Sequence, residues 1–152
     1  MKTIAYFFVV FLATFSVSAQ NVTHKDVAGR WKAVEMGTQG ALANFETGKV
    51  SVSDEWKKNN PGQDAAMLEE KLKKGGPFTN FVVSLTEDGR ISLIVMGKVS
   101  EEGRYTLEPR GDKTVLKGGP MGDDEMEVTL VDGRMEWYIH AEGLKVIFKK
   151  VQ

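Results

Sequence analysis

The sequence predicts a mainly β protein, an antiparallel up-and-down β-barrel of about eight strands with a short helix-turn-helix insertion near residues 53–74. From position 78 onward, apolar and polar residues alternate in short runs, as they do in strands with one buried and one solvated face. Turn residues separate these runs about every 8–12 residues. Two of the separators, Asp88-Gly89 and Asp132-Gly133, are Asp-Gly pairs typical of tight hairpins.

Closure of these strands into a barrel is favoured because the hairpins follow one another without a long crossover connection. Closure also removes the exposed sheet edges that invite aggregation. A two-sheet sandwich fits the periodicity nearly as well, and it is the alternative architecture.

The chain begins with the pattern of an export signal over residues 1–19. Lys2 supplies a positive start, an apolar run extends from Ile4 to Phe15, and small residues end at Ala19. The apolar run is shorter than the roughly 20 residues that a membrane-spanning helix needs. We therefore expect a secreted or periplasmic protein with a single barrel domain over residues 20–152 and no membrane insertion after signal cleavage.

Composition narrows the possible partners. The 152 residues include 20 Lys and Arg against 21 Asp and Glu, so the charge offers no footprint for nucleic acid or an anionic membrane. The chain has no cysteine, which excludes a small disulfide-stapled scaffold. A domain of this length can be stable on its hydrophobic core alone, and we expect a monomer.

The first half of the domain is less regular. The first strand is expected from Val27 to Met36, and residues 41–52 form either one irregular strand or two short ones. Ser53 then has the pattern of a helix N-cap. A break at 59–62 and a new start at Asp64 give the second helix, which ends at the Gly-Gly-Pro of 75–77.

The second half predicts seven strands between Phe78 and Val151. The separating turns are expected at 87–90, 101–104, 110–113, 118–124, 132–133 and 141–143. With the first strand, this makes eight antiparallel strands, a number that closes around side chains and one small ligand.

Gly29-Arg30-Trp31 at the first strand, the serial hairpins and the short last strand together resemble small bacterial lipocalin-like domains, which are calycin-type β-barrels. The resemblance covers most of residues 20–152. It implies that Gly29 and Trp31 lie at the barrel floor and that Trp31 packs against a basic residue of the last strand, Lys145 or Lys149. The helical insertion is similar, more weakly, to the portal helices of intracellular fatty-acid-binding proteins.

Residues for catalysis are sparse. The two histidines, His24 and His140, are expected in an N-terminal tail and on an outward strand position, too far apart for a metal site. Without a cysteine or a Gly-x-Ser-x-Gly elbow, a nucleophile has no candidate. We expect no enzyme, no metal and no cofactor.

The predicted function is therefore non-catalytic binding of a small apolar or amphipathic molecule. Trp56 and Met67 are expected at the barrel portal, and Phe81 and Trp137 as stacking surfaces. The full set of predicted ligand-binding residues is Trp56, Met67, Phe81, Leu85, Leu93, Met126, Met135 and Trp137. The same apolar residues fit a filled core equally well.

The alternative function is a protein-binding barrel with a filled core, such as an exported inhibitor or assembly factor. Long loops at 37–49 and 118–125 would then engage the partner. An exposed apolar patch that includes Ile94, Tyr138 and Ile147 would mark its surface.

Overall fold

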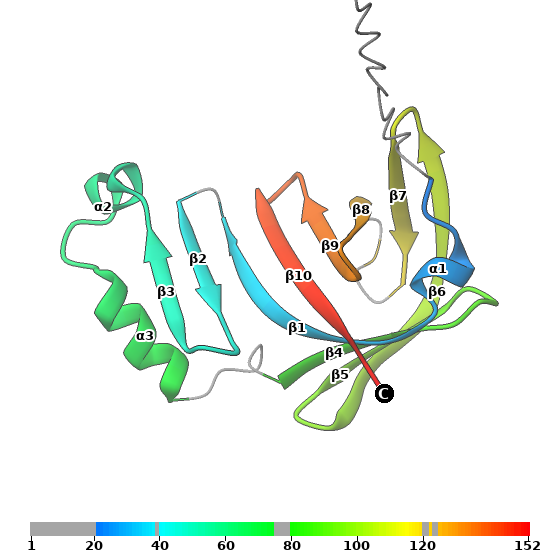
Figure 1. Ribbon diagram of the computed structural model, residues 1–152, viewed down its shortest axis with the longest axis horizontal. Helices are drawn as coiled ribbons and strands as arrows, with labels where there is room; N and C mark the ends of the chain where they lie inside the picture. Colours follow the sequence, from blue (N-terminus) through cyan, green and yellow to red (C-terminus); the bar gives the residue numbers. More distant parts are fainter. Residues whose placement is uncertain (1–20, 39, 75–79, 120–121, 123–124) are drawn as a thin grey trace, which may run out of the picture.

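The computed structural model describes residues 21–38, 40–74, 80–119, 122 and 125–152. This part of the chain forms ten strands and three short helices (Figure 1). Their bounds are α1 His24–Val27, β1 Gly29–Thr38, β2 Ala41–Asn44, β3 Lys49–Val52, α2 Asp54–Asn59, α3 Ala65–Lys73, β4 Phe81–Leu85, β5 Arg90–Val95, β6 Lys98–Arg110, β7 Lys113–Gly118, β8 Glu125–Val131, β9 Arg134–Ile139 and β10 Leu144–Val151. None of the described helices has the length and apolar character needed to cross a membrane.

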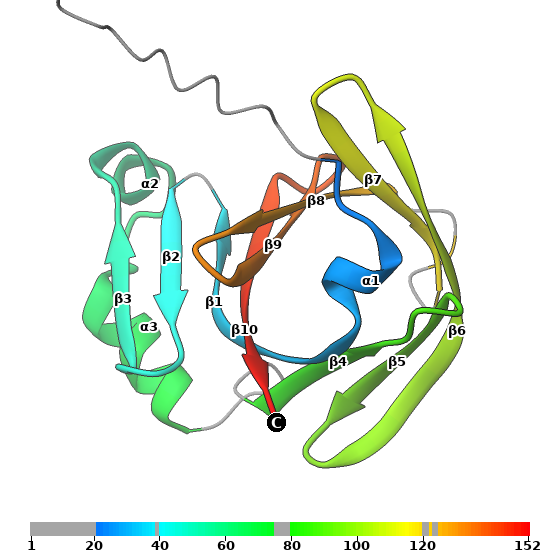
Figure 2. The ribbon, with the colours of Figure 1, turned by 45° about the vertical axis from the view of Figure 1, so that its right-hand side comes forward.

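Eight of the strands close into an antiparallel barrel. Neighbours follow in the order β10-β9-β8-β7-β6-β5-β4-β1, and a further pairing between β10 and β1 closes the ring. The ring is visible at the right of Figure 2. The predicted eight-strand barrel is confirmed, and its architecture is consistent with a calycin-like fold.

β1 changes its partner along one edge. Gly29–Lys32 pair with β4, whereas Glu35–Thr38 pair with β2. Between these two halves, a bulge in the pairing with β10 inserts Val34, and both Ala33 and Val34 are buried. Because β1 leaves β4 at the bulge, the hairpin of β2 and β3 extends away from the barrel.

We call the segment Ala41–Lys73 the wing; it contains β2, β3, α2 and α3 and lies at the left of Figure 1. The region predicted as one or two strands is two. The helix-turn-helix is also confirmed, since Ser53 caps α2 and the Asp64 side chain accepts a hydrogen bond from the Met67 N–H, at 2.8 Å. The Glu69 carboxylate of α3 accepts the Val50 N–H of β3 at 3.1 Å, so α3 covers part of the outer edge of that strand.

Helix α1 occupies one end of the barrel, which we call the plugged end (Figure 2). Val27 is fully buried, and its carbonyl accepts the indole N–H of Trp31 at 2.7 Å. His24 lies against the Tyr105 ring with centroids 5.0 Å apart. The expectation of an N-terminal tail here was therefore wrong. Thr23 and Asp26 cap the helix reciprocally, a signal that the sequence contains.

The predicted basic partner of Trp31 was also wrong. Lys150, and not Lys149 or Lys145, lies over the Trp31 ring, 5.2 Å from its centroid. Trp31 and Lys150 are directly paired across β1 and β10, so their side chains share a face. Lys149 falls on the other face and pairs with Glu46.

Gly29 completes this corner of the barrel floor, beside Trp31. A Cβ at position 29 would meet the Lys150 Cε at 2.7 Å, and the backbone φ of Gly29 is +130°. Glycine therefore makes room for the Lys150 side chain to cross the floor.

One predicted turn was misplaced. Residues 101–104 lie inside β6, and the hairpin between β5 and β6 turns instead at Met96-Gly97, with φ values of 51° and 79°. A bulge between Leu93 and Ile94 shifts the register on this hairpin. Two positive φ angles define a type I′ turn, for which methionine is a poor first residue and asparagine a good one.

We predict that Met96→Asn stabilises the protein by about 0.5–1 kcal/mol, because asparagine adopts a positive φ at lower cost. The Met96 side chain is 76% exposed, so its removal forfeits little packing. Urea unfolding measures the change. The control Gly97→Ala has open space for its Cβ but a φ of +79°, and it should destabilise by about 1–2 kcal/mol. A loss of stability in Met96→Asn would contradict the turn assignment.

Candidate functional site

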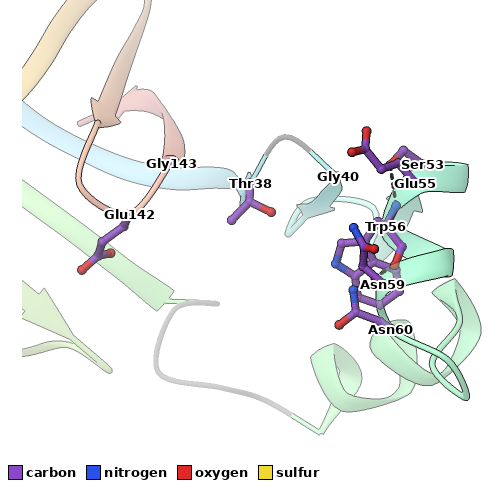
Figure 3. Close-up of a pocket in the computed structure, with 9 residues that line it drawn as sticks. All are labelled: Thr38, Gly40, Ser53, Glu55, Trp56, Asn59, Asn60, Glu142 and Gly143. Atoms are coloured by element: carbon purple, nitrogen blue, oxygen red, sulfur yellow. Dashed lines mark hydrogen bonds between the residues drawn. The ribbon is translucent and has the colours of Figure 1, made fainter.

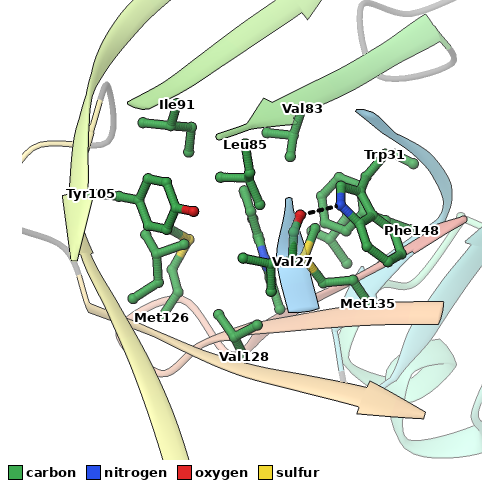
Figure 4. Close-up of a cluster of buried hydrophobic side chains, with 14 of the residues drawn as sticks. Val27, Trp31, Val83, Leu85, Ile91, Tyr105, Met126, Val128, Met135 and Phe148 are labelled. Atoms are coloured by element: carbon green, nitrogen blue, oxygen red, sulfur yellow. Dashed lines mark hydrogen bonds between the residues drawn. The ribbon is translucent and has the colours of Figure 1, made fainter. Parts of the chain in front are cut away.

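The barrel interior is one apolar cluster (Figure 4). Its buried members are Val27, Trp31, Ala33, Val83, Leu85, Ile91, Tyr105, Leu116, Met126, Val128, Met135, Trp137, Ile139, Val146 and Phe148. Four of the predicted ligand-binding residues, Leu85, Met126, Met135 and Trp137, belong to it and are at most 2% exposed. Phe81 and Leu93 are half-buried and pack against it. The structure thus brings six of the eight together.

Trp137 is one of three side chains in this interior that carry a polar group, together with Trp31 and Tyr105. It lies in β9, opposite Val128 of β8 and Val146 of β10, and its ring packs on Phe148 with centroids 4.7 Å apart. Its indole N–H is buried and has no hydrogen-bond partner, the one such side-chain atom among the described residues. Trp31 presents the contrast, since its indole N–H is equally buried but bonded to Val27.

An unpartnered buried donor is costly, by about 1–3 kcal/mol, because the indole loses its water and gains nothing in exchange. Binding sites for small molecules resemble this interior in composition, because they have an apolar wall and a few polar groups that fix the orientation of the ligand. The Trp137 N–H is therefore the candidate polar handle of a site inside the barrel.

The two ends of the barrel differ in how fully their apolar side chains are covered. α1 closes the plugged end, where Val27 and Trp31 are buried. At the other end, where β1 stops and β4 and β10 begin, Met36, Phe81 and Leu144 are only half-buried although they pack against the core. Phe81 reaches Phe148 with a centroid distance of 6.1 Å, which links this end to the ring stacked on Trp137.

The structure places the other two predicted residues, Trp56 and Met67, outside the barrel. Both belong to the wing, which β1 carries away from the barrel wall at its bulge. Met67 is 46% exposed on α3. Trp56 lines a surface cleft of about 460 Å³ between the wing and the turn from β9 to β10 (Figure 3). The cleft is lined by Thr38, Gly40, Ser53, Glu55, Trp56, Asn59, Asn60, Glu142 and Gly143.

The outer face of β6, β7 and β8 carries an ion-pair network. Arg110 donates two hydrogen bonds to Glu125, at 2.6 and 2.8 Å, and Lys117 lies 3.1 Å from the same carboxylate. These bonds, those from Arg110 first, lower the pKa of Glu125 to about 2. Beside them, Glu127 pairs with both Lys113 and His140. Apart from His140, which lies in the turn after β9, these groups are ion-paired side chains on a strand surface. Within the described ranges no three His, Cys, Asp or Glu residues gather as metal ligands.

The surface patch expected of a protein-binding barrel is not formed by the residues that predicted it. Ile147 is buried, and the ring of Tyr138 packs edge-on against His140. Ile94 lies on β5, four places from β9 in the sheet order. The predicted loop at 37–49 is largely the hairpin of β1 and β2, and residues 120–121 and 123–124 of the other loop lie outside the described part of the chain.

We predict that Trp31→Phe costs roughly 1–3 kcal/mol more stability than Trp137→Phe, as measured by urea unfolding. Both substitutions remove the same atoms from a buried ring. Only the first leaves a carbonyl, that of Val27, without its donor. Equal losses would mean that the Trp137 N–H also has a partner within the protein.

We predict that Glu125→Gln makes the protein less stable at neutral pH and that the difference narrows as pH falls from about 5 to about 2. A carboxyl whose pKa drops from 4.5 to about 2 on folding stabilises the fold above 4.5, and this contribution is lost as it protonates. Urea midpoints across this pH range measure it. A difference that stays constant across this pH range would contradict the prediction.

No protein-family model, curated protein or solved structure matches this chain. The chain itself supplies two features, the barrel topology and a buried Trp137 indole N–H without a partner among the described residues. They are the observations on which a function can be built.

Proposed function

We propose that this protein is an exported, non-catalytic, lipocalin-like binding protein whose barrel holds a small, mainly apolar molecule with a hydrogen-bond acceptor. The observation that carries the proposal is the indole N–H of Trp137, which is buried in the apolar cluster and has no partner among the described residues. A hydrogen-bond acceptor on the ligand would remove the free-energy cost of burying this N–H without a partner. The same hydrogen bond would add to the affinity and fix the orientation of the ligand.

The chemistry of the wall narrows the ligand class. Among the described residues, Thr114 is the one buried residue of polar or charged type, so a charge carried deep into the barrel would have no counter-ion. The group that meets Trp137 is therefore neutral, such as a ketone, ester, ether or hydroxyl oxygen. The rest of the molecule packs on Phe81 and Phe148, whose rings connect Trp137 with the less covered end of the barrel.

Export is part of the same proposal. Its support is the signal pattern of residues 1–19, with predicted cleavage before Gln20 and a secreted or periplasmic location for the monomeric barrel. Native mass spectrometry of the protein purified from its own host tests both parts. A chain that begins at Gln20 supports export, and a small-molecule mass lost after solvent extraction supports binding.

The sharper test compares 2-decanone with decane by NMR of the ¹⁵N-labelled protein. We expect the ketone to shift the Trp137 indole N–H resonance downfield and the alkane to leave that proton without an acceptor. In Trp137→Phe, the affinity for the ketone should fall about fivefold relative to the alkane, the value of one neutral hydrogen bond near 1 kcal/mol. The Trp31 resonance is the internal control, because its N–H already has a partner.

If neither molecule perturbs Trp137, the barrel is a filled core and the proposal fails. The alternative function, a protein-binding barrel with a filled core, is then favoured. If the unmodified protein binds ketone and alkane equally well, the barrel has an apolar site, but the proposed hydrogen bond from Trp137 to the ligand is wrong.

A further inference from the structure

We propose that the cleft at Trp56 is a second binding site, for a neutral polyhydroxylated ring such as a sugar unit. The cleft shares no residue with the barrel interior, so this inference does not depend on the proposed function. Its volume of about 460 Å³ lies in the range of small-molecule sites.

The Trp56 indole is held in place before any ligand arrives. Its backbone N–H donates to the Ser53 hydroxyl at 3.1 Å, and the Ser53 N–H donates to the Gly40 carbonyl at 2.8 Å. A Cβ at position 40 would lie 2.8 Å from the Trp56 Cβ and 3.0 Å from its Cδ1. Gly40 therefore lets the indole pack directly on the backbone where β2 begins, while the side chain as a whole stays half-buried.

The polar groups that line the cleft come from two separate parts of the chain. Figure 3 shows Trp56 and Asn59 on the wing, with Glu142 across from them at the turn before β10. Within the described residues, the side chains of Thr38, Glu55, Asn59 and Glu142 make no hydrogen bond, and Asn60 uses only its amide nitrogen, which donates to the Trp56 carbonyl. Donors and acceptors are thus available beside an aromatic face.

The charge of the lining selects among ligand classes. The lining residues include two glutamates and no Lys or Arg, so the cleft repels ligands that carry a phosphate or a carboxylate. Hydroxyl and amide side chains outnumber the carboxylates, and each of them can donate as well as accept hydrogen bonds. They belong to Thr38, Ser53, Asn59 and Asn60. A polyol matches this mixture, since its hydroxyls do the same and the C–H face of a sugar ring packs on an indole. An organic cation would use the carboxylates and the ring but would leave the amide donors without an acceptor.

The test is an NMR titration of the ¹⁵N-labelled protein with glucose, N-acetylglucosamine, cellobiose and chitobiose. We expect at least one of these sugars to cause saturable shifts of the Trp56 indole and the Asn59 amide, with Trp137 unmoved. Asn59→Ala and Glu142→Ala should each weaken that binding about fivefold, the value of one hydrogen bond. Gly40→Ala should weaken it as well, because the new Cβ displaces the indole.

Two variants separate loss of the site from loss of the fold. Trp56→Phe keeps a ring against Gly40 and should retain weakened binding, whereas Trp56→Ala should abolish it. Met67→Ala, on the exposed face of α3 outside the cleft, should bind as the unmodified protein does.

Failure here is distinguishable from failure of the proposed function, because Trp56 and Trp137 give separate indole resonances. Saturable shifts of Trp56 by choline but by none of the sugars would overturn the assignment in favour of a cation site. No response of Trp56 to any of these molecules would overturn the site itself.

Discussion

The division of β1 between two partners is the constraint from which the rest of the structure follows. One edge of β1 pairs with β4 up to Lys32 and with β2 from Glu35, and the two sets of hydrogen bonds cannot occupy the same backbone groups. Val34, inserted between them as a bulge, gives the strand its change of direction. Before the bulge, β1 carries Trp31 into the barrel floor; after it, β1 leads to the wing. The first half of the strand therefore belongs to the barrel floor, and the second half ends at Thr38, which lines the cleft.

The three tryptophans show how one side chain serves different purposes according to its hydrogen bond. Trp31 donates to Val27 and fastens the plug to the barrel. Trp137 is as deeply buried, but its N–H has no acceptor in the described part of the chain. Trp56 is half-buried and held from its backbone side by Ser53 and Gly40. An indole that has its own acceptor contributes to stability, whereas the other two are the side chains on which the two proposed sites rest.

The regular part of the barrel could be predicted from sequence because its signals are local. Alternation of apolar residues sets the inward face of β8, β9 and β10, and the Asp132-Gly133 pair sets a turn. The same alternation, continued from Phe148, would have selected Lys150 as the partner of Trp31. At Met96-Gly97 the local signal fails, since a methionine occupies a position that usually holds asparagine or glycine, and the run Glu101–Arg104 imitates a turn.

The parts that could not be predicted depend on contacts between distant segments. A four-residue helix such as α1 has no periodicity to detect. Its capping residues mark where it starts, but its position as a plug comes from packing on Trp31 and Tyr105. The position of Trp56 depends on where β1 leaves β4, a property of pairing and not of the wing sequence. The lack of a partner for the Trp137 N–H is likewise visible only once all its neighbours are in place.

The seam that closes the barrel also sets the order in which the chain can fold. Arg30 pairs with Val151 and Trp31 with Lys150, residues separated by more than a hundred positions. Contacts of such high sequence separation require a large loss of chain entropy before they form, which slows folding. The hairpins from β4 to β9 can assemble as the chain emerges, but the ring stays open until β10 arrives. A chain that threads through a membrane pore from its first residue would thus cross with its barrel unclosed.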